Sequence, residues 1–240
     1  MERQSLIGVL ANTVQQKRCS HPLRVAIDGV DAAGKTMLAN ELATCLRSFQ
    51  QQVIQASVDD FHHPEKIRRR KGSLSPEGFY HDSYNYPALI ENLLIPLGPN
   101  GNRQYRTASF DLHQNRPVNT PVKTASENAI LLLDGIFLLR PVLLAYWDLT
   151  IYIDADFTTT MQRGIARDEE IFGSTQKAAQ RYRERYMPGQ QLYHQESNPL
   201  DRADIVIDNN QIDTPKILRN HTEQWDKPQN RHNKGKNKNG

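Results

Sequence analysis

The sequence contains little cysteine: Cys19 and Cys45 are the only two thiols among 240 residues. Two cysteines cannot build a disulfide framework, so we expect a reduced, cytoplasmic protein in which both pack as inert side chains. Long hydrophobic runs are also missing, since no stretch approaches the ~20 apolar residues that a membrane-spanning helix needs. The apolar segment 6–11 is too short for a signal-peptide core. We therefore expect neither a membrane anchor nor a leader.

A strong excess of charge of one sign is missing as well. Lys and Arg number 30 against 27 Asp and Glu, and residues 226–240 hold five of the basic residues against one acid. The rest of the chain is thus close to neutral, which argues against a basic nucleic-acid-binding face. Because the last fifteen residues lack apolar periodicity, we predict one domain over 1–225 and a disordered basic tail over 226–240.

Short apolar runs alternate with segments of helical periodicity. Strands that alternate with helices favour right-handed crossovers, so we predict an α/β fold in which a parallel sheet of about five strands is flanked by helices. Two polar segments, 61–85 and 100–124, are long enough to be functional loops rather than tight connections. The five runs that resemble buried parallel strands are 23–27, 53–58, 130–133, 149–153 and 205–207.

The most specific pattern is a complete G-x-x-x-x-G-K-[ST] phosphate loop between the first predicted strand and a predicted helix. Glycines let the backbone turn its N–H groups toward an anion, and the start of the helix adds partial positive charge. Lys35 is expected to reach the β- and γ-phosphates of ATP, and the Thr36 hydroxyl to ligate Mg²⁺. The nucleotide-binding residues are predicted to be Gly29, Val30, Asp31, Ala32, Ala33, Gly34, Lys35 and Thr36.

Acidic side chains follow the second and third predicted strands. Asp59 comes directly after the run 53–58, and Asp134 follows the run 130–133. In a parallel sheet both lie at the same carboxyl edge as the phosphate loop. Phosphoryl transfer to an alcohol needs a carboxylate that accepts the hydroxyl proton and another that holds Mg²⁺. We predict Asp59 as the base, and Asp59 and Asp134 as metal-shell acids; the simpler alternative is that each caps a turn.

Two further segments carry candidate functional side chains. Arg163 and Arg167 are four residues apart and share a helix face, where they can neutralise charge on the transferring phosphoryl group. The alternative is a solvated face paired with the acids at 168–170. Asp82 and Tyr84 lie in an aromatic, polar stretch that can bind an acceptor, although Tyr84 can equally be a packing residue.

Six stretches of the chain, in this order, resemble the uridine kinase / phosphoribulokinase family of P-loop kinases. They span most of residues 22–210 and are 25–36, 59–62, 110–116, 134–137, 163–168 and 203–207. The resemblance implies a P-loop NTPase-type sheet with a lid segment and a substrate hairpin. It also implies that Asp59 is the catalytic base, assisted by Lys35, Arg163 and Arg167. The implied acceptor contacts are Phe61, His62, Asp82, Tyr84, His113 and Arg116.

The hairpin segment departs from the uridine kinase pattern Tyr-Asp-Phe-x-x-His-x-Arg. Here 110–116 is one residue shorter, and His113 follows Asp111 by two positions rather than four. We predict ATP- and Mg²⁺-dependent transfer of the γ-phosphate to a small molecule, first the 5′-hydroxyl of uridine or cytidine. Pantothenate, nicotinamide riboside and a pentose phosphate stay open as acceptors, and a non-catalytic nucleotide-binding regulatory module is the alternative of another class. No nucleic-acid or membrane partner is expected, and self-association is left open.

Overall fold

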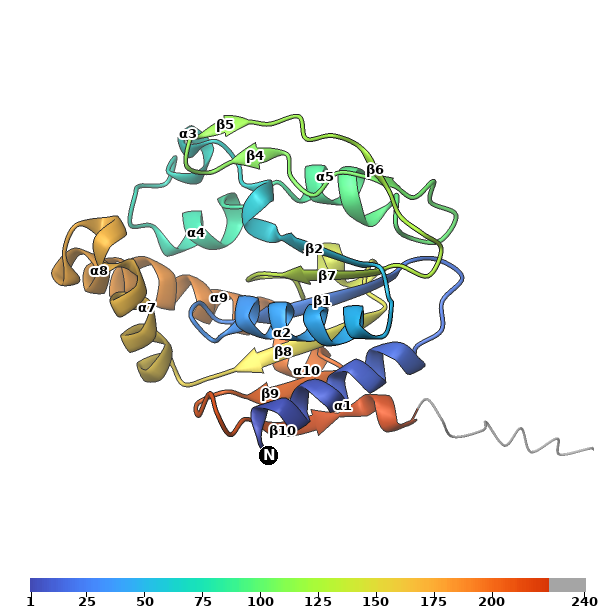
Figure 1. Ribbon diagram of the computed structural model, residues 1–240. Coiled ribbons are helices and arrows are strands. Elements are labelled where there is room, and N and C mark those ends of the chain that lie inside the picture. Colours follow the sequence, from blue (N-terminus) through green and yellow to red (C-terminus); the bar gives the residue numbers. More distant parts are fainter. Residues whose placement is uncertain (225–240) are drawn as a thin grey trace, which may run out of the picture.

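A six-stranded sheet forms the centre of the fold (Figure 1). The computed structural model describes residues 1–224, so the predicted basic tail over 226–240 lies outside the described residues. The strand order is β10-β9-β8-β1-β7-β2, and every neighbouring pair is parallel except β10 with β9. The strands are β1 (Leu23–Gly29), β2 (Val53–Ser57), β7 (Ile130–Asp134), β8 (Leu149–Asp154), β9 (Ile205–Asp208) and β10 (Lys216–Asn220).

All five predicted strands are present, which confirms the α/β fold. β10 was not predicted, because three of its five residues are polar (Lys216, Arg219 and Asn220) and it lies at an edge of the sheet. Such an antiparallel edge strand needs no continuous apolar run, since one side of it faces solvent.

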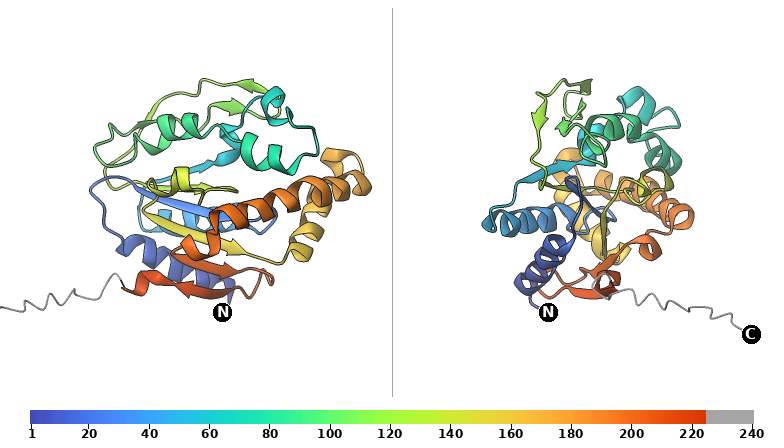
Figure 2. Two further views of the ribbon diagram at one scale, coloured as in Figure 1. Left: turned by 180° about the vertical axis from the view of Figure 1, so that it is seen from behind. Right: turned by 90° about the vertical axis from the view of Figure 1, so that its right-hand side faces the viewer.

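Helices cover both faces of the sheet (Figure 2). Along β1, Val25 and Ile27 face the core under α1 and α2, whereas Ala26 faces the core on the other side, under α4, α5 and α9. This alternation follows from the two-residue period of a strand. The helices are α1 (Arg3–Gln16), α2 (Lys35–Ser48), α3 (Glu65–Arg68), α4 (Pro76–Asp82), α5 (Tyr86–Leu89), α6 (Pro141–Leu144), α7 (Phe157–Phe172), α8 (Thr175–Arg181), α9 (Met187–Ser197) and α10 (Pro199–Arg202).

Shorter elements connect these layers. Among residues 1–224 no helix is long and apolar enough to cross a lipid bilayer. The 3₁₀ turns are η1 (Val58–Phe61) and η4 (His221–Gln224), the π-helical turns are η2 (Ile90–Leu94) and η3 (Tyr182–Tyr186), and the small antiparallel pairs are β3 (Gln104–Tyr105) with β6 (Lys123–Thr124) and β4 (Phe110–Asp111) with β5 (Arg116–Pro117).

The predicted lid segment and the predicted substrate hairpin lie on either side of the carboxyl edge of the sheet. The lid segment, residues 157–186, contains α7, α8 and η3 and extends beyond the ends of the central strands (Figure 1). The predicted substrate hairpin is the pair β4–β5, which reaches back to η1 because the Ser109 N–H donates to the Asp60 carbonyl over 3.0 Å.

Candidate active site

The phosphate loop connects β1 to α2 and needs glycine at both of its ends. Gly29 has φ 152°, and a Cβ there would stand 2.4 Å from the Ile153 carbonyl oxygen. Gly34 has φ 100°, and its Cβ would stand 2.6 Å from the Asn209 side-chain nitrogen. The loop is thus held against β8 and the segment after β9, and only glycine fits these approaches.

Lys35 begins α2, and its ammonium group donates to the Val30 carbonyl over 2.7 Å. The side chain is buried, and this burial lowers the pKa of Lys35. Four carboxylates oppose the shift because they favour the charged lysine; they are Asp31, Asp28, Asp134 and Asp59. The sheet therefore brings the acids predicted from the strand ends to the same place as the phosphate loop.

Thr36 and Asp134 form the best-defined contact of the site. The Thr36 hydroxyl donates to Asp134 Oδ2 over 2.6 Å, and Asp134 is only 9% exposed. Burial raises the pKa of Asp134, while the Thr36 hydrogen bond and the charge of Lys35 lower it. A hydroxyl and a carboxylate are the hard oxygen ligands that Mg²⁺ prefers, so the donors at this point fit the predicted metal.

Asp59 lies on η1 and is exposed, so its carboxylate is accessible to a small molecule. Its Oδ1 accepts a hydrogen bond from the Tyr84 hydroxyl over 3.0 Å. His62 lies beside this pair: its ring centroid is 4.6 Å from that of Tyr84, and its Nδ1 is 2.8 Å from the Asp59 carbonyl. Burial lowers the pKa of His62, so a neutral ring with a proton on Nδ1 satisfies that carbonyl.

The two predicted lid arginines have different surroundings. Arg167 donates to Asp31 of the phosphate loop over 3.2 Å and to Asp168 over 2.7 Å, so it lies at the nucleotide site. The Arg163 guanidinium instead donates to the backbone carbonyls of Asn209 and Asn210, at 3.1 and 2.8 Å. Arg163 thus anchors the lid helix to the segment after β9.

Among the described residues, four predicted acceptor contacts form no hydrogen bond or ion pair with Asp59. Phe61 is fully buried in the apolar core. Asp82 is 4% exposed and forms an ion pair with Arg70, whose Nε donates to it over 3.0 Å. His113 and Arg116 are exposed on the β4–β5 hairpin. For all four, a role in acceptor binding stays a prediction.

Asp28 is a site residue that sequence reasoning missed. It is fully buried, and its carboxylate accepts hydrogen bonds from the Gly29 and Leu139 N–H groups, at 2.7 and 3.1 Å, and from the Tyr193 hydroxyl. Burial raises the pKa of Asp28 to about 6, against the effect of these donors. Gln190, one turn before Tyr193 on α9, accepts the Asp31 N–H over 2.5 Å. Helix α9 therefore contacts the phosphate loop at two points: Tyr193 binds Asp28 just before the loop, and Gln190 binds Asp31 within it.

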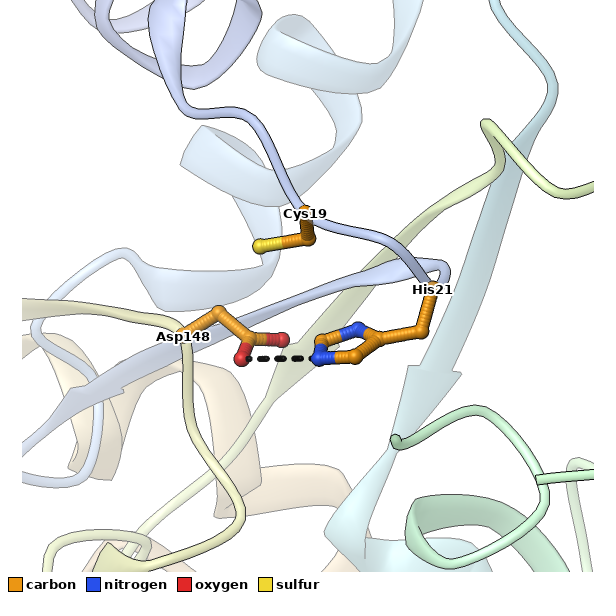
Figure 3. Close-up of side chains that lie close together, drawn as sticks. All are labelled: Cys19, His21 and Asp148. Atoms are coloured by element: carbon orange, nitrogen blue, oxygen red, sulfur yellow. Dashed lines mark ion pairs between the residues drawn. The ribbon is translucent and has the colours of Figure 1, made fainter. Parts of the chain in front are cut away.

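A second group of metal-ligand side chains lies at the opposite, amino edge of the sheet (Figure 3). Cys19, His21 and Asp148 point toward one another, and His21 Nε2 is 3.7 Å from Asp148 Oδ1. Both Asp148 oxygens also accept hydrogen bonds from Arg24, whose Nε donates over 3.0 Å and Nη2 over 3.1 Å. An arginine already neutralises this carboxylate, so the cluster is explained by a buried ion pair.

Comparisons with known proteins agree with this geometry. The Phosphoribulokinase / Uridine kinase family matches residues 25–214 of the chain. A pantothenate kinase from Shewanella sp. strain MR-4 is 28% identical over 170 residues, which are 62% of this chain and 50% of the relative. A pantothenate kinase from Streptococcus thermophilus strain LMD-9 is 26% identical over 181 residues, 72% of this chain and 58% of the relative. The chain thus spans about half the length of the curated relatives it matches.

Solved structures share the fold. A protein described as a possible uridine kinase from Bacillus stearothermophilus superposes with a TM-score of 0.67 at 23% identity, covering 86% of this chain and 99% of the other. At this identity the likeness concerns the arrangement of strands and helices, and it supports the α/β architecture described above.

Proposed function

Because the chain belongs to the Phosphoribulokinase / Uridine kinase family, we propose that it is an ATP-dependent kinase that phosphorylates a hydroxyl group of a small molecule. The observation that carries this proposal is the convergence of Lys35, Thr36, Asp134 and Asp59 at one edge of the sheet. A non-catalytic nucleotide-binding module would need the phosphate loop, but it would not need an exposed carboxylate across from it.

In the proposed reaction Asp59 accepts the proton of the acceptor hydroxyl, and the oxygen attacks the γ-phosphorus of ATP in line. The bond from the γ-phosphorus to the β,γ-bridging oxygen breaks, and ADP leaves. The Tyr84 hydroxyl holds the Asp59 carboxylate by its hydrogen bond of 3.0 Å, which fixes the direction from which the proton is taken. Lys35 and Arg167 stabilise the charge on the transferring group. Most of the rate enhancement then comes from positioning and electrostatics.

Thr36 and Asp134 are the residues that would hold Mg²⁺, which neutralises phosphate charge when bound. In this chain the Thr36 hydroxyl already orients one Asp134 oxygen. The near-complete burial of Asp134 keeps competing water away from its carboxylate. The positive charge of Lys35 interacts with the Asp134 carboxylate and partly neutralises it.

An anionic acceptor is favoured by two arginines on the acceptor side. Arg68 donates to the His63 carbonyl over 2.8 Å and interacts electrostatically with Glu65 and, more weakly, with Tyr84 and Tyr186. Arg185 is 5% exposed and donates to the Ser75 carbonyl over 2.9 Å. No carboxylate of residues 1–224 lies within ion-pair distance of either guanidinium. Arg185 is buried and Arg68 half-buried, and buried charges are usually paired, so a carboxylate or phosphate of the acceptor would complete this site.

Pantothenate carries such a carboxylate, and the curated relatives are named pantothenate kinase. A neutral nucleoside, uridine or cytidine, is the second candidate, supported by the polar side chains of His62 and Tyr84 beside Asp59.

The experiment is ADP release from ATP and Mg²⁺ with a panel of acceptors: pantothenate, uridine, cytidine, nicotinamide riboside and ribulose 5-phosphate. We expect one acceptor class to raise ADP release well above the acceptor-free rate. Equal rates with and without every acceptor, from a protein that still binds ATP, would favour a binding module.

A further inference from the structure

An acidic residue lies inside the phosphate loop itself. Asp31 is the third residue of the loop, and its carboxylate is surrounded by hydrogen-bond donors. Oδ1 accepts the Ala32 N–H over 3.0 Å and the Arg167 guanidinium over 3.2 Å, and Oδ2 is 2.9 Å from the Tyr182 hydroxyl. The acid is therefore bound in the way that a phosphate oxygen would be, by a loop N–H, a hydroxyl and a guanidinium.

The cations around Asp31 are those that a nucleotide's terminal phosphate needs. Lys35 and Arg167 both interact electrostatically with Asp31, and their charges hold the pKa of its carboxyl below the usual value although burial opposes this. Asp31 is also the strongest of the acidic neighbours of Lys35. A loop lysine reaches the β- and γ-phosphates, so Asp31 and the γ-phosphate compete for the positive charges of Lys35 and Arg167.

A carboxylate at this position has an energetic consequence for nucleotide binding. Like charges brought together in a partly desolvated site repel each other. The γ-phosphate therefore has to separate Asp31 from Arg167 before it can bind the Arg167 guanidinium. ADP has no γ-phosphate and can bind while these contacts stay in place. The acid thus acts on the two nucleotides unequally.

We propose that Asp31 sets the preference of the loop between ATP and ADP: its carboxylate occupies the guanidinium of the lid residue Arg167 until the γ-phosphate displaces it. The inference rests on the proposed function, since it concerns the same nucleotide site. Asp31 is expected to change the ratio of the affinities for ATP and ADP. A residue that only shaped the loop would change both affinities by the same factor.

The test is calorimetric titration of the full chain with the ATP analogue adenylyl imidodiphosphate and, separately, with ADP, both with Mg²⁺. Asp31→Asn keeps the size of the side chain and removes its charge. We expect the affinity for the triphosphate analogue to rise about tenfold and that for ADP to change less than about twofold. Asp31→Glu keeps the charge and should keep the wild-type ratio of the two affinities.

Two controls make the result decisive. Glu170→Gln removes an exposed charge from the same lid helix and should leave both affinities unchanged. Asp31→Ser provides a second neutral side chain if the Asn variant does not fold. Affinities for both nucleotides that fall together, or that stay at the wild-type ratio, would overturn the inference. If the wild type binds neither nucleotide, the proposed function itself fails.

Discussion

The Thr36 hydroxyl and the Asp134 carboxylate meet over 2.6 Å, although 98 positions of the chain separate them. Thr36 lies in the first turn of helix α2, which follows the phosphate loop, and Asp134 ends the neighbouring strand β7. β1 and β7 are paired in parallel with Ile27 opposite Asp134, so the contact follows directly from the register of the sheet. Strand register thereby brings together two oxygen groups that no local sequence pattern links.

Thr36→Val tests this pair. The variant keeps the shape of the side chain and removes the hydroxyl, so we expect the Mg²⁺ concentration for half-maximal activity to rise at least about tenfold. Thr36→Ser retains the hydroxyl and should stay near the wild type. A Val variant whose Mg²⁺ titration matches that of the wild type would remove Thr36 from the metal site.

Arg167 and Arg163 should separate into different roles. Arg167→Gln removes the cation next to the phosphate loop, and we expect kcat to fall by about 100-fold. Arg163→Gln removes hydrogen bonds to the Asn209 and Asn210 carbonyls, so it should lower the free energy of unfolding by about 1–2 kcal/mol while kcat changes little. Steady-state kinetics and denaturant unfolding of both variants check this, and the reverse pattern would contradict it.

Arg68 should recognise the charge of the acceptor. If the acceptor is anionic, Arg68→Gln should raise the KM for the acceptor by about tenfold and leave the KM for ATP unchanged. Arg69→Gln is a matched control, because Arg69 already pairs with Glu65. An unchanged acceptor KM in the Arg68 variant would favour the neutral nucleoside instead.

Asp28 should make stability depend on pH between about 4 and 6. Burial raises the pKa of Asp28 from 3.8 to about 6, so in this window the folded protein holds a proton that the unfolded chain has lost. The free energy of unfolding therefore falls as the pH rises through the window and no longer changes with Asp28 above it. Asp28→Asn lacks this term, so from pH 4 to 7 its stability should gain about 2–3 kcal/mol relative to the wild type.

Denaturant unfolding of both proteins across this pH range measures the difference directly. Glu170→Gln, which changes an exposed acid, should follow the wild-type curve. Parallel curves for the wild type and the Asp28 variant would contradict the assignment.

The parts of the site that the sequence predicts are those that depend on local pattern or on strand ends. The phosphate loop is a contiguous motif, and Asp59 and Asp134 follow from the parallel sheet, because its carboxyl ends share one edge. The five predicted strands were found from their mainly apolar runs, whereas β10 mixes charged and apolar residues at one edge of the sheet.

What the sequence does not contain is the pairing of side chains between distant segments. Nothing in the local sequence links Asp82 to Arg70 or Asp28 to Tyr193, which is 165 positions away. Asp31 reads as one of four variable positions of the loop motif until the lid brings Arg167 against it. These contacts are set by how helices pack onto the sheet, so only the three-dimensional structure reveals which acids are already neutralised.

The central claim is that Asp59 takes the proton of the acceptor hydroxyl at the phosphate loop. It is tested most directly by phosphoryl transfer to the identified acceptor in Asp59→Asn, with nucleotide affinity measured in parallel and the adjacent exposed acid variant Asp60→Asn as control. We expect kcat to fall at least about 1,000-fold in Asp59→Asn with nucleotide affinity within about twofold, and both to stay near the wild type in Asp60→Asn. Transfer by Asp59→Asn at more than about a tenth of the wild-type rate would contradict the account.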